Sequence, residues 1–402
     1  MRVGWGTIPL GEVYDVRDGT HDSPKYQAEG FPLITSKNLK SGQLNFDKVK
    51  YISKEDLEKI NKRSAVNTGD VLFAMIGTIG NPTIIQGETD FAIKNVALFK
   101  NNETQSSKFL QYYLQSKAVI DKMMAEAKGT TQKFVGLGYL RKFPFICPPL
   151  EEQKRIVAIL DEAFEGLDRA RAHTEANLQN AKELFESRLK DTFIKTSSEW
   201  KTKSLVEVTS KIGSGATPRG GAASYKSEGI SLVRSMNVHD RSFVTKKLAF
   251  IDDEQASKLK NVILEQNDVL LNITGASVAR CCVMPDDFLP ARVNQHVSIL
   301  RTDTEELLPR FLCYELTSES YKNMLLGIGE EGGSTRQAIT KKQIQSLEVT
   351  YPNIEEQQQI ISLLEIVEKA TKKLKQDYHS KLTDLDDLRQ SLLQKAFAGE
   401  LT

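Results

Sequence analysis

Apolar residues recur with a helical period over a long stretch near the middle of the chain, and the same stretch returns at its end. The first copy runs from Leu150 to about Phe193, and the second follows 204 residues later. Leu189 and Phe193 of the first copy match Leu393 and Phe397 of the second without a gap, and neither copy contains proline. An internal repeat of this kind predicts two matched structural units.

Both copies are predicted to be long helices. Their apolar positions are separated by alternating steps of four and three residues, a period typical of coiled coils. A helix with one apolar stripe needs a partner, and the Ala-rich first stripe and Leu-richer second stripe favour pairing with each other. The alternative is that each helix packs only on its own globular part. The predicted stripes are Ile156, Leu160, Ala163, Leu167, Ala170, Thr174, Asn177, Ala181, Leu184 and Arg188, and Ile360, Leu364, Val367, Thr371, Leu374, Tyr378, Lys381, Leu385, Leu388 and Leu392.

The segments before each helix also repeat. Strands are expected at residues 71–76 and 92–99 and again at 268–275 and 297–300, and helices at 109–127 and 311–325. The order predicts an α+β chain in which two similar α/β domains are separated by two long antiparallel coiled-coil helices, with pseudo-twofold symmetry. The expected domains are residues 1–149, 150–196, 197–352 and 353–402.

Composition and charge narrow the class of protein. The chain has 402 residues and a net charge of only +1, and the basic surplus is confined to residues 1–150, which carry net +5. This balance argues against tight nonspecific binding to nucleic acid by the chain alone. Four cysteines without metal-ligand spacing fit a reducing cytoplasm. We see no signal peptide and no apolar run long enough to span a membrane.

Several motifs together resemble the specificity subunit, of the HsdS type, of type I restriction–modification systems. The likeness covers the whole chain, and the order of its parts matches. Each motif is moderately specific alone, and the combination with the duplication is strong. The motifs are Asp18-Gly19-Thr20-His21-Asp22-Ser23-Pro24-Lys25-Tyr26, Gly213-Ser214-Gly215-Ala216-Thr217-Pro218 followed by Tyr225, Pro148-Pro149-Leu150-Glu151-Glu152-Gln153, and Lys395-Ala396-Phe397-Ala398-Gly399-Glu400-Leu401.

The resemblance implies a division of labour between this chain and its partners. Each target-recognition domain is expected to read one half of a bipartite double-stranded DNA target, while the helices set the gap. The helices are also expected to dock two methyltransferase (M) subunits, and restriction (R) subunits can join. The chain itself then carries no catalytic residue, no metal and no cofactor. S-adenosylmethionine belongs to the methyltransferase partner, and ATP and Mg belong to the restriction partner.

Two other classes of protein were weighed. A fused methyltransferase would need an Asn/Asp-Pro-Pro-aromatic loop, and Asn81-Pro82-Thr83-Ile84 is only half of that. Phe134-Val135-Gly136-Leu137-Gly138 matches a cofactor-loop pattern but reads better as a loop before a short helix. The remaining alternative is a coiled-coil scaffold whose end domains bind protein or RNA.

DNA-contact candidates are polar side chains on loops between the expected strands. Arg and Lys can pair with guanine edges and Asn and Gln with adenine edges, although many such side chains contact phosphates instead. Solvated loop residues are an equally good interpretation of any one of them. The first-half candidates are Arg17, Thr20, His21, Lys25, Tyr26, Lys37, Asn38, Thr78, Lys94, Asn95, Thr131, Gln132 and Lys133. The second-half candidates are Thr217, Arg219, Tyr225, Arg234, Asn237, Asn272, Thr274, Arg280, Arg292, Asn294, Gln295, His296, Thr335, Arg336 and Gln337.

The first turns of the two long helices are the expected partner-binding surface. Acidic side chains there also favour the positive end of a helix dipole, so a purely structural role is equally open. The candidates are Glu151, Glu152, Gln153, Arg155, Glu355, Glu356 and Gln357.

Overall fold

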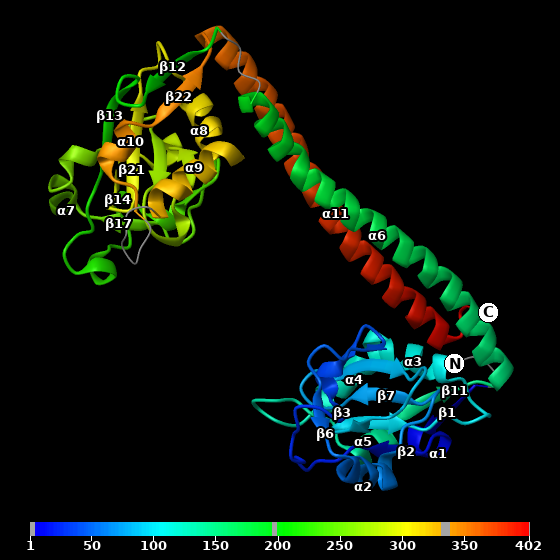
Figure 1. Ribbon diagram of the computed structural model, residues 1–402. Coiled ribbons are helices and arrows are strands. Elements are labelled where there is room, and N and C mark those ends of the chain that lie inside the picture. The colour runs from blue at the N-terminus through cyan, green and yellow to red at the C-terminus, as the bar shows by residue number, and fades with distance from the viewer. Residues whose placement is uncertain (1–4, 195–198, 331–337, 402) are drawn as a thin grey trace. The chain divides into compact units, whose positions relative to one another are not determined.

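The computed structural model describes residues 5–194, 199–330 and 338–401. Its contacts divide the chain into two compact units, the first comprising residues 1–175 and 380–402 and the second residues 176–379. Two helices of 45 residues each, α6 (Leu150–Ile194) and α11 (Ile354–Ala398), contribute a part of their length to both units. The predicted pair of long helices is therefore present, and each unit is described separately below (Figure 1).

The globular part of the first unit contains three small sheets, a hairpin and several short helices. Its elements are β1 (Gly6–Pro9), α1 (Leu10–Val13), β2 (Val16–Asp18), β3 (Phe31–Ile34), the 3-10 helix η1 (Ser36–Asn38), β4 (Leu39–Lys40), β5 (Gln43–Leu44), β6 (Lys50–Ile52), α2 (Lys54–Ser64), β7 (Val71–Ala74), β8 (Gly80–Ile84), β9 (Ala92–Ile93), β10 (Val96–Phe99), α3 (Ser107–Gln115), α4 (Lys117–Glu126), α5 (Leu137–Lys142) and β11 (Pro144–Cys147).

The globular part of the second unit has the same plan. Its elements are β12 (Lys201–Ser204), β13 (Thr209–Ser214), η2 (Gly221–Ser224), β14 (Ile230–Val233), η3 (Ser235–Asn237), β15 (Val238–His239), β16 (Ser242–Phe243), β17 (Ala249–Ile251), α7 (Asp253–Ser257), η4 (Lys260–Val262), β18 (Val269–Asn272), η5 (Gly275–Ser277), β19 (Cys281–Val283), η6 (Asp286–Phe288), β20 (Ala291–Val293), β21 (Val297–Thr302), α8 (Pro309–Thr317), α9 (Glu319–Glu330), α10 (Lys341–Gln345) and β22 (Glu348–Tyr351).

Sheet topology is the same in the two units. The main antiparallel sheet has the order β2-β10-β7-β8 in the first unit and β13-β21-β18-β19 in the second. A smaller mixed sheet has the order β6-β3-β9 or β17-β14-β20, and its last pair is parallel. The central strands β7 and β18 are buried throughout, as their continuous apolar runs predict. The repeat seen in the sequence is thus a repeat of topology.

Within the first unit, α6 and α11 run side by side in opposite directions (Figure 1). Arg171 of α6 forms an ion pair with Asp386 of α11, and Asp168 accepts from Arg389 at 2.5 Å, so later residues of one helix meet earlier residues of the other. The apolar core of the globular part continues onto both helices, where Phe397 packs edge-on against Phe109 with ring centres 5.3 Å apart. In the second unit, Phe185, Leu189 and Leu364 form the corresponding helix-to-helix cluster.

The predicted apolar stripe of α6 is wrong at three positions in its second half, where Thr174 and Ala181 are buried as predicted. Asn177, Leu184 and Arg188 are exposed, and the buried residues are their neighbours Leu178, Phe185 and Leu189. In α11, Leu374, Lys381 and Leu388 are likewise exposed. A strict 3.5-residue repeat drifts by about 20° per heptad against a straight helix. After three heptads the drift reaches about 60°, more than half of the angle of about 100° between successive residues, so some predicted positions face outward while their neighbours are buried.

Candidate nucleic-acid interface

Three strand ends meet at one edge of the main sheet in the first unit. Asp18 at the end of β2 pairs with Ala97, and Val96 at the start of β10 pairs with Ala74 at the end of β7. The loops that follow β2 and β7 and precede β10 are therefore neighbours. The segment 128–134 joins them, because Gly77 N donates to Lys133 O at 2.8 Å. We call residues 19–23, 75–78, 94–95 and 128–134 the first strand-end site.

Gly19 allows the closest approach in this site. Its N–H donates to Val96 O at 3.0 Å, and a Cβ at this position would lie 2.2 Å from Ile93 O. Any larger residue would collide with that backbone carbonyl. Gly19 of the Asp18–Tyr26 motif is therefore required for loop packing.

The same convergence occurs in the second unit. Ser214 pairs with Ser298 and Asn272 with Val297, so β13, β18 and β21 bring their loops to one edge. Gly215 N donates to Asn294 O at 3.1 Å, and a Cβ on Gly215 would lie 1.8 Å from Val293 O. We call residues 215–217, 273–274 and 294–296 the second strand-end site.

Polar side chains bridge the loops of the first strand-end site. His21 contacts Asn95 Oδ1 through Nδ1 at 2.8 Å and Asp18 Oδ2 through Nε2 at 2.9 Å. Lys94 Nζ donates to Ser23 Oγ at 2.5 Å. The structure thus gathers one group of predicted contact residues at this edge, namely Thr20, His21, Thr78, Lys94, Asn95, Thr131, Gln132 and Lys133.

A similar network occupies the second strand-end site. Thr217 Oγ1 donates to Gln295 Oε1 at 2.5 Å, and His296 Nδ1 lies 2.5 Å from Thr274 Oγ1. Gln295 Nε2 lies 3.1 Å from His296 Nε2. The predicted Thr335, Arg336 and Gln337 lie outside the described residues.

Five predicted contact residues are buried and already hydrogen-bonded, so the prediction that they face DNA is wrong. Asn38 and Asn237 each bind two backbone segments: Asn38 Nδ2 donates to Asn45 O at 2.9 Å and Asn237 Nδ2 to Val244 O at 2.8 Å. Asn272 Nδ2 donates to Ser235 O at 2.8 Å. The five are Asn38, Asn237, Asn272, Arg292 and Asn294. Burial also lowers the pKa of the Arg292 guanidinium.

Other predicted residues lie beside the strand-end sites. Arg17 is held on β2 by Asp15 at 2.6 Å, and this hydrogen bond raises its pKa. Tyr26 lies further along its loop, where Lys50 Nζ stacks over its ring at 4.0 Å. In the second unit Arg234 stacks over Tyr225 at 5.2 Å. Lys25, Lys37 and Arg219 are exposed, and Arg280 is half-buried just before β19.

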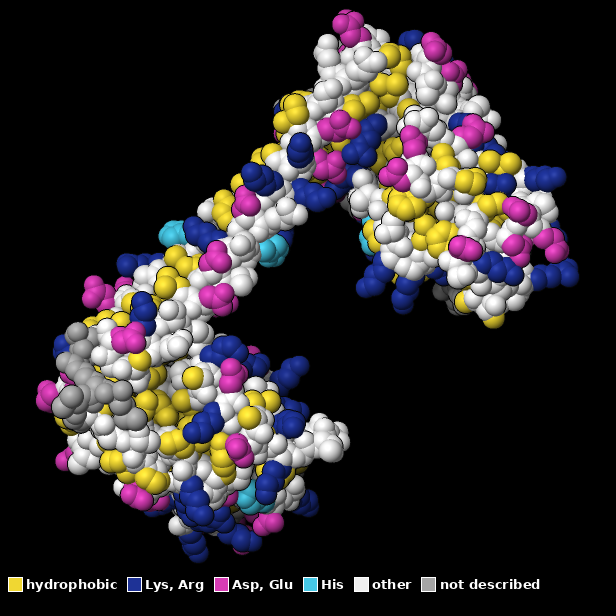
Figure 2. All heavy atoms as spheres, turned by 180° about the vertical axis from the view of Figure 1, so that it is seen from behind, with side chains coloured by type: hydrophobic (Ala, Val, Ile, Leu, Met, Phe, Trp, Pro, Cys, Tyr) yellow, Lys and Arg dark blue, Asp and Glu magenta, His cyan; other side chains and the backbone are white. Residues whose placement is uncertain are grey.

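Helix α2 was not predicted from the sequence, and it brings a cationic side chain to the first strand-end site. Arg63 of α2 forms an ion pair with Asp18, the carboxylate that also contacts His21. Figure 2 shows Lys and Arg side chains gathered over α2 on this face of the first unit. A capping serine followed by an acidic first turn, Ser53 with Glu55 and Asp56, was the available signal.

The predicted partner surface is reduced from seven residues to five. Gln153 and Gln357 are fully buried, so they cannot present their side chains to another protein. At the surface, Glu152 pairs with Arg155 at 2.9 Å. Glu356 accepts from Trp200 Nε1 at 3.1 Å. The five that remain are Glu151, Glu152, Arg155, Glu355 and Glu356.

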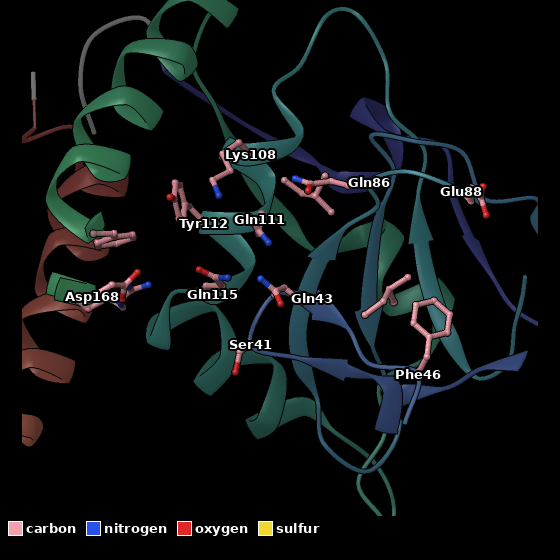
Figure 3. Close-up of a pocket in the computed structure, with 15 residues that line it drawn as sticks. Ser41, Gln43, Phe46, Gln86, Glu88, Lys108, Gln111, Tyr112, Gln115 and Asp168 are labelled. Atoms are coloured by element: carbon pink, nitrogen blue, oxygen red, sulfur yellow. The ribbon is translucent and has the colours of Figure 1, made fainter. Parts of the chain in front are cut away.

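A polar cleft of about 780 Å³ lies between the β4–β5 hairpin, α3 and the paired helices of the first unit. Figure 3 shows Lys108, Gln111, Tyr112 and Gln115 of α3 facing it, with Ser41 and Gln43 from the hairpin and Asp168 from α6. In the second unit Arg241, from the turn of the equivalent β15–β16 hairpin, contacts Glu186 of α6 at 2.7 Å and Glu368 of α11 at 3.3 Å.

Residues 5–194, 199–330 and 338–401 contain no group of three or more His, Cys, Asp and Glu placed to hold a metal ion. No helix within these residues has the length and apolar character needed to cross a membrane. The Phe134–Gly138 pattern is a loop that runs into the first two residues of α5, in agreement with its simpler interpretation.

Relatives and solved structures of similar fold cover nearly the whole chain. The type I restriction enzyme MjaVIII specificity subunit of Methanocaldococcus jannaschii is 23% identical over 92% of this chain and 91% of its own length. The EcoKI specificity subunit of Escherichia coli is 21% identical over 99% and 89%. The HsdS subunit from Thermoanaerobacter tengcongensis has a similar fold, with a TM-score of 0.61 at 22% identity over 100% of this chain and 98% of that one.

A further solved structure, from work on complex assembly and conformational transition of the type I R-M system, superposes with a TM-score of 0.76 at 22% identity. It covers 100% of this chain and 99% of its own. The family model of the type I restriction modification DNA specificity domain matches twice, at residues 2–178 and 197–383. The chain therefore belongs to the type I restriction–modification specificity subunits.

Proposed function

We propose that this chain reads a bipartite double-stranded DNA target, one half with each strand-end site, and acts as a scaffold without catalysis of its own. The observation that carries the proposal is the recurrence of one polar arrangement at one sheet edge in both units. In each, a glycine lies against a backbone carbonyl, and the loop after it hydrogen-bonds to an amide side chain one or two residues before an inner strand, Asn95 before β10 or Gln295 before β21. Two copies of one reading surface suit a target with two halves.

The long helices supply the second part of the proposal. Each is continuous for 45 residues and contributes a part of its length to both units. We expect the length of the helices to set the gap between the two half-sites. Dimeric DNA readers use the same principle with two chains.

Partners supply the chemistry in this proposal. Two methyltransferase subunits dock on the helix surfaces that include Glu151, Arg155 and Glu355, and they bring S-adenosylmethionine. Restriction subunits, which bring ATP and Mg, join in the cytoplasm. The polar cleft beside Tyr112 is another candidate docking surface for such a subunit, and cross-linking from this cleft tests it.

A domain exchange tests the reading proposal. Residues 1–149 are replaced by the equivalent segment of another specificity subunit, and the methylated motif is mapped by sequencing after assembly with the methyltransferase partner. We expect one half of the motif to change and the other half and the gap to persist. A change in both halves, or in neither, contradicts the model of two independent readers.

The alternative, a coiled-coil scaffold with protein- or RNA-binding ends, makes a different prediction. Footprinting of the assembled complex on duplex DNA would then show no sequence-limited protection. The exchange would leave the methylated motif unchanged.

A further inference from the structure

We propose that Asn95 and Gln295 are the side chains that read adenine, one in each half of the target, and that His21 and Thr217 hold their amides in the reading orientation. This inference rests on the proposed function and names its specificity-determining residues. Asn95 immediately precedes β10, and Gln295 lies one residue further from β21, so both stand at the edge where three strand ends meet. Both carry the same functional group.

The partner of each amide also occupies an equivalent place. His21 is the second residue after Gly19, and Thr217 is the second residue after Gly215. His21 Nδ1 lies 2.8 Å from Asn95 Oδ1, and Thr217 Oγ1 lies 2.5 Å from Gln295 Oε1. An imidazole and a hydroxyl are chemically different, yet each contacts the amide oxygen. The arrangement is therefore kept although the residue types have changed.

Hydrogen-bond valence leaves each amide with one acceptor and one donor for a ligand. An amide oxygen only accepts, so His21 and Thr217 are the donors, and one lone pair remains on each oxygen. His296 Nε2 takes one N–H of Gln295 at 3.1 Å, which leaves the other N–H. Asn95 retains Nδ2 donors, for which the described part of the chain supplies no bond. One acceptor beside one donor matches N6–H and N7 of adenine in the major groove.

The positioning contacts fix which end of the amide points where. Asp18, which is 4% exposed, lies 2.9 Å from His21 Nε2 and anchors the imidazole ring beside Asn95. Gln295 is held at both ends, by Thr217 and by His296. A preset amide cannot flip to present its donor where the acceptor is needed. Preorganisation of this kind increases discrimination between bases.

A purely structural role for Asn95 must be separated from reading. Asn95 has a φ of 54°, a left-handed conformation that Asn and Gly tolerate best. Asn95→Gly keeps this backbone and removes the amide. If Asn95 served only the turn, Asn95→Gly would leave target selectivity unchanged.

The experiment is selection of a randomised duplex DNA library by the full-length chain assembled with its methyltransferase partner, followed by sequencing. We expect Asn95→Gly to lower the preference for adenine at one position of the first half by roughly 10- to 100-fold, the discrimination of a bidentate amide–adenine pair. Gln295→Ala should do the same in the second half only. Asn67→Ala, at an exposed amide in the loop before β7 and so at the opposite end of the first sheet, should leave both halves unchanged.

The positioning role is tested with Thr217. Thr217→Val has the same shape without the hydroxyl and should lower selectivity at the same base pair as Gln295→Ala. Thr217→Ser keeps the hydroxyl donor and should retain selectivity. The inference is overturned if Asn95→Gly and Gln295→Ala leave the selected motif unchanged. It is also overturned if they lower selectivity for a base other than adenine. If exchange of residues 1–149 still alters one half, the two-reader model survives that outcome. If the exchange alters neither half, both fall.

Discussion

Gln153 and Gln357 occupy the same place in the two units, where each side chain joins the first turn of a long helix to the segment before a short one. Gln153 Oε1 accepts from Ser106 N at 3.0 Å, and Gln357 Oε1 accepts from Leu308 N at 2.9 Å; these residues immediately precede α3 and α8. Each Nε2 also donates to a proline carbonyl, Pro148 O at 2.8 Å or Pro352 O at 2.9 Å. The repeated Glu-Glu-Gln sequence therefore contains an anchor between helix and globular part.

Removing this anchor should destabilise the unit that contains it. Gln357→Ala leaves Leu308 N–H and the carbonyls of Glu306 and Pro352 without their partner, and we expect a loss of about 3 kcal/mol in the free energy of unfolding. Gln357→Glu should cost more, because a carboxylate would face two carbonyl oxygens. Urea denaturation, with hydrogen exchange of α8 and α11, measures the effect.

The matched control is Gln358→Ala, at the exposed neighbouring position on the same helix. It should change stability by less than about 0.5 kcal/mol. Equal stability of Gln357→Ala and Gln358→Ala would show that the anchor is not needed.

Arg241 should matter for stability although it lies on a hairpin turn. Its side chain is 13% exposed, contacts Glu186 and Glu368, and stacks over Phe185 at 4.6 Å. We expect Arg241→Ala to cost about 1–2 kcal/mol in the second unit, since the half-exposed Glu186 is screened by solvent. Part of that difference should disappear at about 1 M salt, where such charges are screened within about 3 Å.

Arg241→Lys tests whether the planar guanidinium is required. Lys keeps the charge but cannot bind two carboxylates while stacking on a ring, so most of the loss should remain. Lys372→Ala, at an exposed position on α11, serves as the control. If Arg241→Lys had the stability of the parent, the positive charge alone would account for the effect of Arg241.

The sequence predicted the presence of these elements better than it predicted which face of each is buried. The two long helices, the strands β7 and β18, and their repetition follow from length and apolar period. The register of the stripe did not, because a pattern of Ala, Leu and polar residues fits a 3.5-residue repeat and a 3.6-residue one over a few turns. Leu178 and Phe185 are buried where the strict repeat placed Asn177 and Leu184.

Candidate site residues were limited by a different ambiguity. A polar side chain in a loop gives the same sequence pattern whether it faces solvent or binds the backbone of its own chain. Asn38 and Asn237 do the second, and so does Gln153 at a helix start. Only tertiary contacts distinguish the two cases. His21 and Gln295, by contrast, are exposed at the strand ends.

Glu315 should make the second unit less stable as pH rises. Its carboxyl is buried, and burial raises its pKa to about 8, although the hydrogen bond from Thr350 N at 2.9 Å opposes the shift. The folded state thus favours the neutral acid. Its stabilising contribution is complete below the unfolded-state pKa, about 4.3, and is lost as pH rises through about 8. The loss should be on the order of 1 kcal/mol per pH unit in this window.

Glu315→Gln should remove most of this dependence. We expect the variant to gain stability relative to the parent at pH 9 compared with pH 5, measured by urea denaturation at both values. Glu305→Gln, at an exposed position in the same unit, should not alter the slope. Parallel pH profiles for parent and Glu315→Gln would contradict the assigned cause.

Lengthening both long helices should widen the gap in the DNA target without altering either half. Four residues added to each helix, after Glu175 in α6 and after His379 in α11, extend it by about 6 Å. That length corresponds to roughly two base pairs at about 3.4 Å each. Because ion pairs such as Arg171–Asp386 join the helices, an insertion in α6 alone should impair assembly instead. Mapping the methylated motif decides: an unchanged gap in the double insertion would mean that the helices do not measure it.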